Sequence, residues 1–110
     1  MSIKVVYNAR YGGFSISRAC AQRMAELGSE EAAALIAESE ESEQFHGYLY
    51  ETPRHDPILV QAVEELGEAA GGKLASLGVH ELTGRKYIID EYDGSESVVE
   101  PQDIVWTLVD

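Results

Sequence analysis

The spacing of the apolar residues changes along this chain. In two early runs they recur every three or four positions: Ile16, Cys20, Met24 and Leu27, and then Leu59, Val63, Leu66 and Ala70. Beyond residue 76, short apolar runs follow one another with turn residues between them. The first spacing places apolar side chains along one face of a helix, and the second is typical of strands. Helices followed by strands in one chain predict an α+β fold.

Start and stop signals bound the predicted helices. Either Ser15 or Ser17 is placed to cap the first helix, and Gly28 ends it. Asp56 has the chemistry of an N-cap for another helix, with Pro57 at the first helical position. We expect this helix to end at the glycine pair, residues 71–72.

Between these two helices, Ser29 caps a further one. Glu30 and Glu31 lie in its first turn, where the helix dipole favours anions. The acid-rich residues 38–43 are expected to fray its end, because like charges repel along a helix.

Short apolar segments rich in β-branched and aromatic residues predict strands at residues 3–7, 45–50, 77–82 and 86–92. Asp93-Gly94 is a hairpin signal, after which residues 97–99 pair back. Neither a repeat nor a long linker divides the chain. We therefore predict one α+β domain over residues 1–110, with about three helices packed on a small, mainly antiparallel sheet.

Cysteine content and hydropathy bear on location. The single cysteine, Cys20, excludes an internal disulfide and suits a reducing cytoplasm. The apolar runs are all too short to span a membrane, and the first residues lack the features of a signal peptide. We expect a cytoplasmic protein without a membrane partner.

The charged residues are distributed unevenly. Residues 1–23 contain four basic side chains and no acid, whereas residues 24–53 and 87–110 contain acids and neither Lys nor Arg. With a net charge of −12, direct binding of nucleic acid is not expected. A basic protein surface is the natural complement, and solubility is the alternative explanation. The candidate partner-binding acids are Glu30, Glu31, Glu38, Glu40, Glu41, Glu43, Asp90, Glu91, Asp93 and Glu96.

A glycine pair lies between the first strand and the first helix, in the sequence YGGFS. Backbone N–H groups at a helix start favour anions, and glycine allows a ligand to approach closely. The alternative is a plain turn, since neither a dinucleotide fingerprint nor a P-loop is present. The candidate ligand-binding residues are Arg10, Tyr11, Gly12, Gly13, Ser15 and Arg18.

The sequence gives little support for a catalytic site or a metal site. His55 is adjacent to Asp56, but adjacent residues seldom face each other, and Asp56 is already explained as a cap. The histidines are isolated, no cysteine pair exists, and no loop has calcium spacing. We expect neither an enzyme, nor a metal, nor a cofactor.

Four blocks resemble small bacteriophage and prophage proteins: NARYGGFSIS (8–17), RHDPILVQAVEELG (54–67), residues 75–82 and YIIDEYDGSESV (87–98). Members of that group are similar in having a YGGFSLS-like start, an R-[HD]-DP helix start and an EYDG turn. The resemblance implies a phage setting, in which small acidic proteins are often inhibitors of host defence, including anti-CRISPR proteins. It carries no activity over to this chain.

Charge and resemblance together predict a phage-encoded accessory protein that binds a host nucleic-acid-handling protein. We expect a partner such as a CRISPR effector complex, whose DNA-binding groove a rigid surface of carboxylates would occupy in competition with DNA. The alternative function is a small-ligand or nucleotide-binding protein that uses the glycine pair at the helix start.

Overall fold

The computed structural model describes residues 2–110. Its elements are β1 (Lys4–Asn8), α1 (Arg18–Glu26), α2 (Glu30–Ser42), α3 (Pro57–Leu66), β2 (Leu77–Glu81), β3 (Ile88–Tyr92) and β4 (Ser95–Val99). Short 3₁₀ turns, Gly67–Ala70 and Pro101–Asp103, follow α3 and β4. β1 pairs antiparallel with β2, and β3 with β4, so the predicted α+β class is confirmed, with two small sheets.

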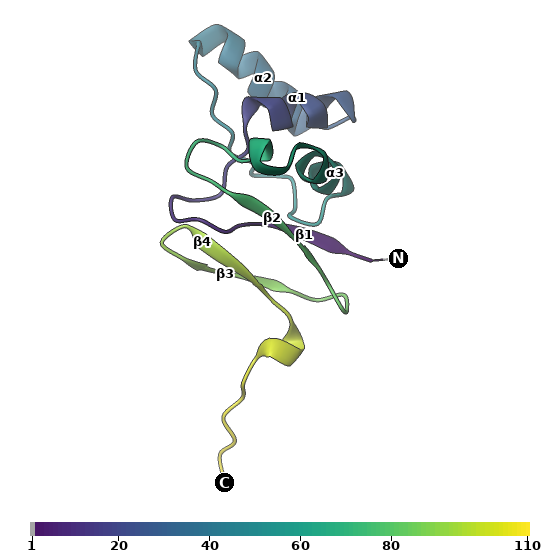
Figure 1. The fold of residues 1–110 in the computed structure, drawn as a ribbon, viewed down its shortest axis with the longest axis vertical. Helices are drawn as coiled ribbons and strands as arrows, with labels where there is room; N and C mark the ends of the chain where they lie inside the picture. Colours follow the sequence, from purple (N-terminus) through teal and green to yellow (C-terminus); the bar gives the residue numbers. More distant parts are fainter. Residues whose placement is uncertain (1) are drawn as a thin grey trace.

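The elements form three layers. The helices lie over one side of the β1–β2 pair, and the β3–β4 hairpin lies on its other side (Figure 1). Val5 and Val6, neighbours on β1, are both fully buried. Because successive side chains of a strand point to opposite faces, burial of both residues means that both faces of β1 are covered.

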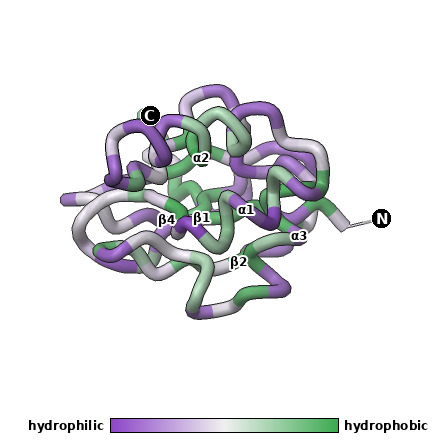
Figure 2. Tube along the Cα trace, turned by 90° about the horizontal axis from the view of Figure 1, so that it is seen from above, coloured by the Kyte–Doolittle hydropathy of each residue, from purple (hydrophilic) through white to green (hydrophobic). Residues whose placement is uncertain are grey.

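The main core lies between β1 and the helices. Apolar positions gather towards the middle of the molecule, and hydrophilic positions occupy most of the outer turns (Figure 2). Ile16, Met24 and Leu59 are among its largest fully buried side chains. Cys20 is also buried there, and burial raises the pKa of its thiol to about 11. Among residues 2–110, no helix is long and apolar enough to cross a membrane.

The predicted helix starts are confirmed. Ser17 caps α1 by accepting from the Cys20 N–H, and Ser29 caps α2 in the same way. Asp56 caps α3 by accepting from the Leu59 N–H. The α-helical part of α3 ends at Leu66, earlier than the predicted glycine pair, and the 3₁₀ turn fills the interval.

The predicted fraying of the second helix is wrong. α2 continues to Ser42, through the acid-rich residues. Ser39 is only 2% exposed, and its hydroxyl accepts from Arg18 Nη1 at 2.9 Å. This contact with α1 holds the last turns of α2, while the carboxylates around Ser39 stay in water, where repulsion is screened.

The predicted strand at residues 45–50 is also wrong, since this segment has no regular structure. Gly47 packs so closely that a Cβ built on it would lie 1.8 Å from the Ile16 carbonyl oxygen. Its own carbonyl accepts from the Ile16 N–H at 2.8 Å. Further on, the Glu31 carboxylate accepts from the backbone N–H groups of Tyr50, Glu51 and Thr52. A carboxylate thus satisfies donors that a neighbouring strand would otherwise take.

Candidate functional site

Four exposed glutamates surround the end of α2. Glu38, Glu40 and Glu41 lie in its last turns, and Glu43 follows as the C-cap with a φ of 62°. We call these four residues the α2 acidic end. Within residues 2–110 none of them forms an ion pair with a basic side chain.

The charges of the α2 acidic end oppose the helix dipole. The C-terminal end of a helix carries partial negative charge, so carboxylates there are unfavourable and cations favourable. The last turn of α2 contains no basic residue. The chain therefore keeps an electrostatically unfavourable cluster at this helix end.

Arg18 is the residue that positions this cluster. It begins α1, where the dipole disfavours a cation. Its side chain reaches across to Ser39 on α2, and its guanidinium lies 5.4 Å from the centre of the Phe45 ring. Arg18 therefore joins α1 to the end of α2 and to the segment that follows.

A cavity of about 390 Å³ lies beside the α2 acidic end. Glu38 and Glu41 line it, together with Ser42, Gln44 and His46. Both carboxylates face a space large enough for the end of a lysine or arginine side chain. The arrangement suits a cationic group from a partner.

The two acids at the start of α2 differ in their roles. Glu30 is exposed in the first turn, as a favourable partner of the dipole. Glu31 accepts from Thr52 and the backbone groups before it. Partial burial opposes its charge, but these hydrogen bonds lower its pKa overall. Glu31 therefore fastens the loop before α3 and is not free for a partner.

The acids of the β3–β4 hairpin also differ in exposure and in role. Asp90 and Asp93 are exposed, and Glu91 accepts from the Gly94 N–H at the turn. Glu96 was expected on a partner-binding surface, yet it is 8% exposed. Its carboxylate accepts from both terminal nitrogens of Arg54, so it is an internal ion-pair partner instead.

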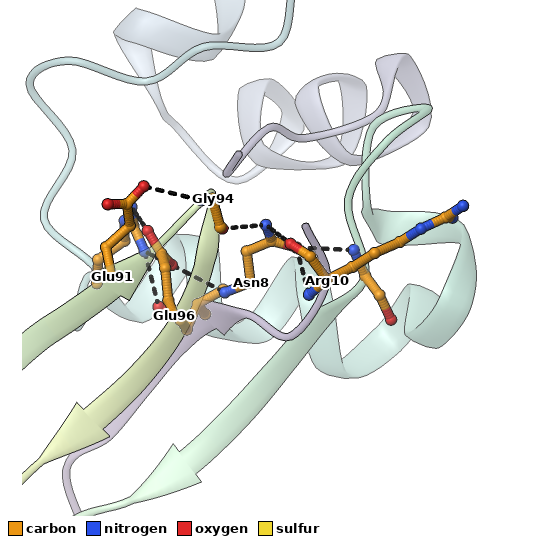
Figure 3. Close-up of polar contacts among 8 residues, drawn as sticks. Asn8, Arg10, Glu91, Gly94 and Glu96 are labelled. Carbon is orange, nitrogen blue, oxygen red and sulfur yellow. Dashed lines mark hydrogen bonds and ion pairs between the residues drawn. The ribbon is translucent and has the colours of Figure 1, made fainter. Parts of the chain in front are cut away.

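Glu96 belongs to a polar cluster that joins the three layers. The Asn8 backbone N–H donates to its Oε1 at 2.9 Å, and the Asn8 side chain donates to the Gly94 and Arg10 carbonyls (Figure 3). The Arg54 guanidinium lies 3.6 Å from the centre of the Phe14 ring. The cluster ties the hairpin to β1 and to the start of α3.

The glycine pair packs against the hairpin turn. The Gly12 N–H donates to the Asp93 carbonyl at 3.3 Å, and a Cβ on Gly94 would lie 2.2 Å from the Gly13 nitrogen. Gly12 and Gly13 have φ values of 121° and 91°, which residues other than glycine rarely adopt. Positive φ accounts for glycine at both positions, and at Gly12 a Cβ would also lie 2.9 Å from the Leu74 carbonyl oxygen.

A second cavity of about 390 Å³ lies next to this turn. Gly12, Ser15 and Arg18 line it, whereas Arg10, Tyr11 and Gly13 do not. The Arg10 side chain extends away from the polar cluster (Figure 3). The structure adds residues from two other segments, His46 and the Gly71-Gly72-Lys73 run. We call this space the basic cavity.

The remaining candidates serve structural roles. His55 Nδ1 lies 2.7 Å from the Tyr87 hydroxyl, and Asp56 caps α3, so the two neighbours do not interact as an acid–base pair. Over residues 2–110, no group of three or more His, Cys, Asp or Glu side chains is arranged to hold a metal ion.

Several residues of these sites lack a local sequence signal. Ser39 lies in an acid-rich run, and only the structure shows that it is buried and accepts a hydrogen bond from Arg18. His46 and Lys73 come from segments far apart in sequence. The Arg54–Glu96 pair spans 42 positions.

Comparisons with known proteins return no relative: no protein-family model, no curated protein and no solved structure matches this chain.

Proposed function

We propose that this chain is a non-enzymatic binding protein that presents the α2 acidic end to a basic surface of a nucleic-acid-handling protein. The observation that carries the proposal is the set of four exposed carboxylates at a helix end whose dipole disfavours them. Natural sequences depart from local rules mostly at functional sites, where the stability cost is offset by a gain elsewhere.

The density of charge supports partial mimicry of DNA. A helix rises ~1.5 Å per residue, so the four carboxylates between positions 38 and 43 span about 7.5 Å. Four charges are separated by three intervals, so this is one charge per ~2.5 Å, of the same order as the one charge per ~1.7 Å of duplex DNA. A groove that binds DNA therefore meets a similar density of negative charge.

The firmness of the acidic end supports the same proposal. The contacts of Arg18 with Ser39 and Phe45 order the last turns of α2 before any partner arrives. A binding surface that is already ordered loses less conformational entropy on association. The cavity between Glu38 and Glu41 is then ready to receive a lysine or arginine side chain. In the phage setting that the sequence blocks imply, the partner is a host protein such as a CRISPR effector.

The test is a pull-down from bacterial lysate with three baits: the natural chain, a variant with Glu40, Glu41 and Glu43 changed to Lys, and a matched control. The control changes Glu51, Glu68 and Glu81 to Lys, which alters net charge equally at exposed positions elsewhere. We expect a nucleic-acid-binding protein on the natural chain and the control, and none on the first variant. Added duplex DNA is expected to displace it.

Two results contradict the proposal. If both charge variants lose the captured protein equally, net charge rather than the α2 acidic end determines binding. If duplex DNA does not compete, the partner is bound away from its nucleic-acid groove and the mimicry is wrong.

A second candidate function is an anionic small-ligand site in the basic cavity. The observation that favours it is the convergence of Arg18, Lys73 and His46 from three separate segments around one space. Ser15 and the glycine backbone add hydrogen-bonding groups. Such a mixture of cations and small polar groups suits a phosphate-containing molecule.

This candidate is tested by measuring the thermal midpoint with AMP, ATP and inorganic phosphate, for the natural chain and for Lys73→Ala. A midpoint that rises with nucleotide in the natural chain alone supports the site. An unchanged midpoint with every probe, or an equal rise in both proteins, rejects it.

A further inference from the structure

The segment after the last 3₁₀ turn leaves its apolar side chains in water. Residues 104–109, with the sequence IVWTLV, run away from the fold without regular structure (Figure 1). Val105, Trp106, Leu108 and Val109 are between 75% and 95% exposed. A contiguous apolar stretch exposed in this way marks an interaction site. We call it the apolar segment.

The composition of the apolar segment is that of a strand. It contains three β-branched aliphatic residues, a threonine and a tryptophan, all of which favour extended structure. It has no charged residue, in a chain of net charge −12. A segment of this kind gains most from pairing with the open edge of a sheet.

The same molecule offers such an edge. β3 pairs with β4 along one side, and within the described part of the chain no strand pairs with its other side. β3 has five residues, and the apolar segment has six. Ile88 and Tyr92, at the two ends of β3, are exposed apolar side chains.

An apolar cavity lies at the start of β3. Its volume is about 560 Å³, and its lining includes Tyr87, Ile88, Val99 and Trp106. The basic residues Arg85 and Lys86 also line it. Apolar surface therefore extends from the cavity to the start of the open edge at Ile88, and the exposed acids Asp90 and Glu91 follow before Tyr92.

We propose that a second copy of this chain covers this region, with the apolar segment of each copy paired along the free edge of β3 in the other. The chain carries both a strand-like segment and an open edge of matching length, so it is complementary to itself. Exchange about a two-fold axis satisfies both copies at once and closes the assembly as a dimer. Within one copy Trp106 lies at the cavity beside Ile88, whereas the end of the segment points away from the hairpin (Figure 1).

The size of the exchanged surface is adequate. Six extended residues reach about 20 Å, which is the length of a typical strand. Two such segments and the surfaces that they cover bury on the order of 1,200 Å², the lower bound for specific interfaces. The apolar segment is uncharged, so it brings no carboxylate of its own against Asp90 and Glu91 of β3, and the repulsion between the two copies comes from their net charge.

The first measurement combines sedimentation with the fluorescence of Trp106, the only tryptophan. Over about a hundred-fold range of concentration we expect conversion of monomer to dimer. Trp106 emission is expected to shift to shorter wavelength in parallel. A monomer at every concentration overturns the proposal, as does a shift of Trp106 emission without any change in mass.

Variants then locate the contact. Trp106→Ser is expected to weaken the dimer at least about tenfold, as for an aromatic residue at the centre of an interface. Thr107→Pro and Leu108→Pro each remove one backbone donor, and adjacent N–H groups of a strand point to opposite sides. One of the two is expected to weaken the dimer, and Thr107→Ser to leave it intact. A dimer that tolerates both prolines does not pair through this backbone.

Experiments with salt and with lipid vesicles distinguish a second copy of the chain from a lipid surface as the group that covers the apolar segment. Added NaCl is expected to strengthen the dimer, because it screens repulsion between acidic copies and leaves apolar contacts intact. The proposed partner binding through the α2 acidic end is expected to weaken under the same conditions, so either proposal can fail without the other. A Trp106 shift on phosphatidylcholine vesicles with a monomer in water identifies a lipid surface instead and overturns the dimer.

Discussion

Among residues 2–110, Glu96 and Glu100 are the two acids that the fold buries. Each lies in a stretch of chain without Lys or Arg, so neither has a basic neighbour in sequence. Glu96 receives Arg54 from the start of α3, and Glu100 receives His80 from β2 together with the Thr83 backbone and hydroxyl groups. A buried carboxylate is tolerated only with such donors.

Changing Glu96 to Gln is expected to lower the free energy of unfolding by about 3 kcal/mol. The substitution leaves the mostly buried Arg54 guanidinium without a counter-charge, which costs more than the pair itself contributes. Urea unfolding followed by circular dichroism measures the loss. Asp90→Asn, an exposed change on the same hairpin, is the control, with an effect within about 0.5 kcal/mol. Equal stability of the two variants contradicts the assigned role of the cluster.

Glu100 is expected to account for part of the stability that the protein loses at acidic pH. The hydrogen bond with His80, aided by Thr83, lowers the pKa of this carboxyl to about 2. An unfolded glutamate has a pKa of about 4.3, so the stabilisation is present above this value and is lost as the pH falls towards about 2. We expect Glu100→Gln to be less stable at pH 7 and to lose stability less steeply between about pH 5 and pH 2. Parallel curves for the two proteins contradict this assignment.

At the scale of elements, α1 and α2 each carry charges that their own dipole disfavours. Arg18 is at the start of α1, and the α2 acidic end is at the opposite pole of its helix. Either feature alone suggests a weak helix end. When α1 packs on α2, Arg18 reaches Ser39. The cation at the start of α1 and the carboxylates at the end of α2 then partly offset each other.

Arg18→Ala is expected to loosen the last turns of α2. The hydrogen bond to Ser39 and the stacking on Phe45 are both lost. Amides of residues 40–42 are expected to exchange at least about tenfold faster, as for the loss of a hydrogen bond to a charged group. Hydrogen exchange read by mass spectrometry measures the change. Arg23→Ala serves as control on the same helix, since Arg23 pairs with Glu65 on α3. Unchanged exchange in α2 refutes the anchoring role of Arg18.

The charge-reversal variant of Glu40, Glu41 and Glu43 is expected to fold more stably than the natural chain. Lysines at a helix end agree with the dipole and remove carboxylate repulsion, a gain of about 1–2 kcal/mol in total. The midpoint of urea unfolding measures it. Higher stability together with lost partner binding is the signature of a functional surface. Lower stability shows that the acids serve the fold.

For the whole molecule, acids outnumber Lys and Arg by 20 to 8, so a net charge of −12 remains however the ion pairs form. Like charges on a compact body repel, and the Debye length shortens from ~30 Å at 0.01 M salt to ~10 Å at 0.1 M. We therefore expect the free energy of unfolding to rise by about 1 kcal/mol over this range. Thermal unfolding at several NaCl concentrations tests the expectation. A fall with salt means that the ion pairs outweigh the repulsion.

At the scale of the whole molecule, three of the four sequence blocks meet at one place. NARYGGFSIS contributes Asn8 and Phe14, the R-H-D-P block contributes Arg54, and the EYDG block contributes Gly94 and Glu96. These segments are far apart in sequence and meet in one polar cluster. In this chain, residues of these three blocks therefore help to hold the three layers together.

The sequence by itself determined the local structure. Caps, prolines and glycines act within a few residues, so Ser17, Ser29 and Asp56 were found at helix starts as expected, and Asp93-Gly94 in a hairpin. The helical and strand spacings reflect burial of one face of an element, and they predicted the α+β class. All of these signals have a short range along the chain.

Only the tertiary structure decided which charges are free. Glu96 and Glu38 look alike in sequence, but one is enclosed by Arg54 and Asn8 and the other remains in water. The same holds for residues 38–43, expected to fray but held by Arg18, and for residues 45–50, whose backbone groups bond to Ile16 and Glu31 instead of to a strand. Solvation and pairing of a charge depend on contacts between distant segments, and such contacts leave no periodicity in the sequence.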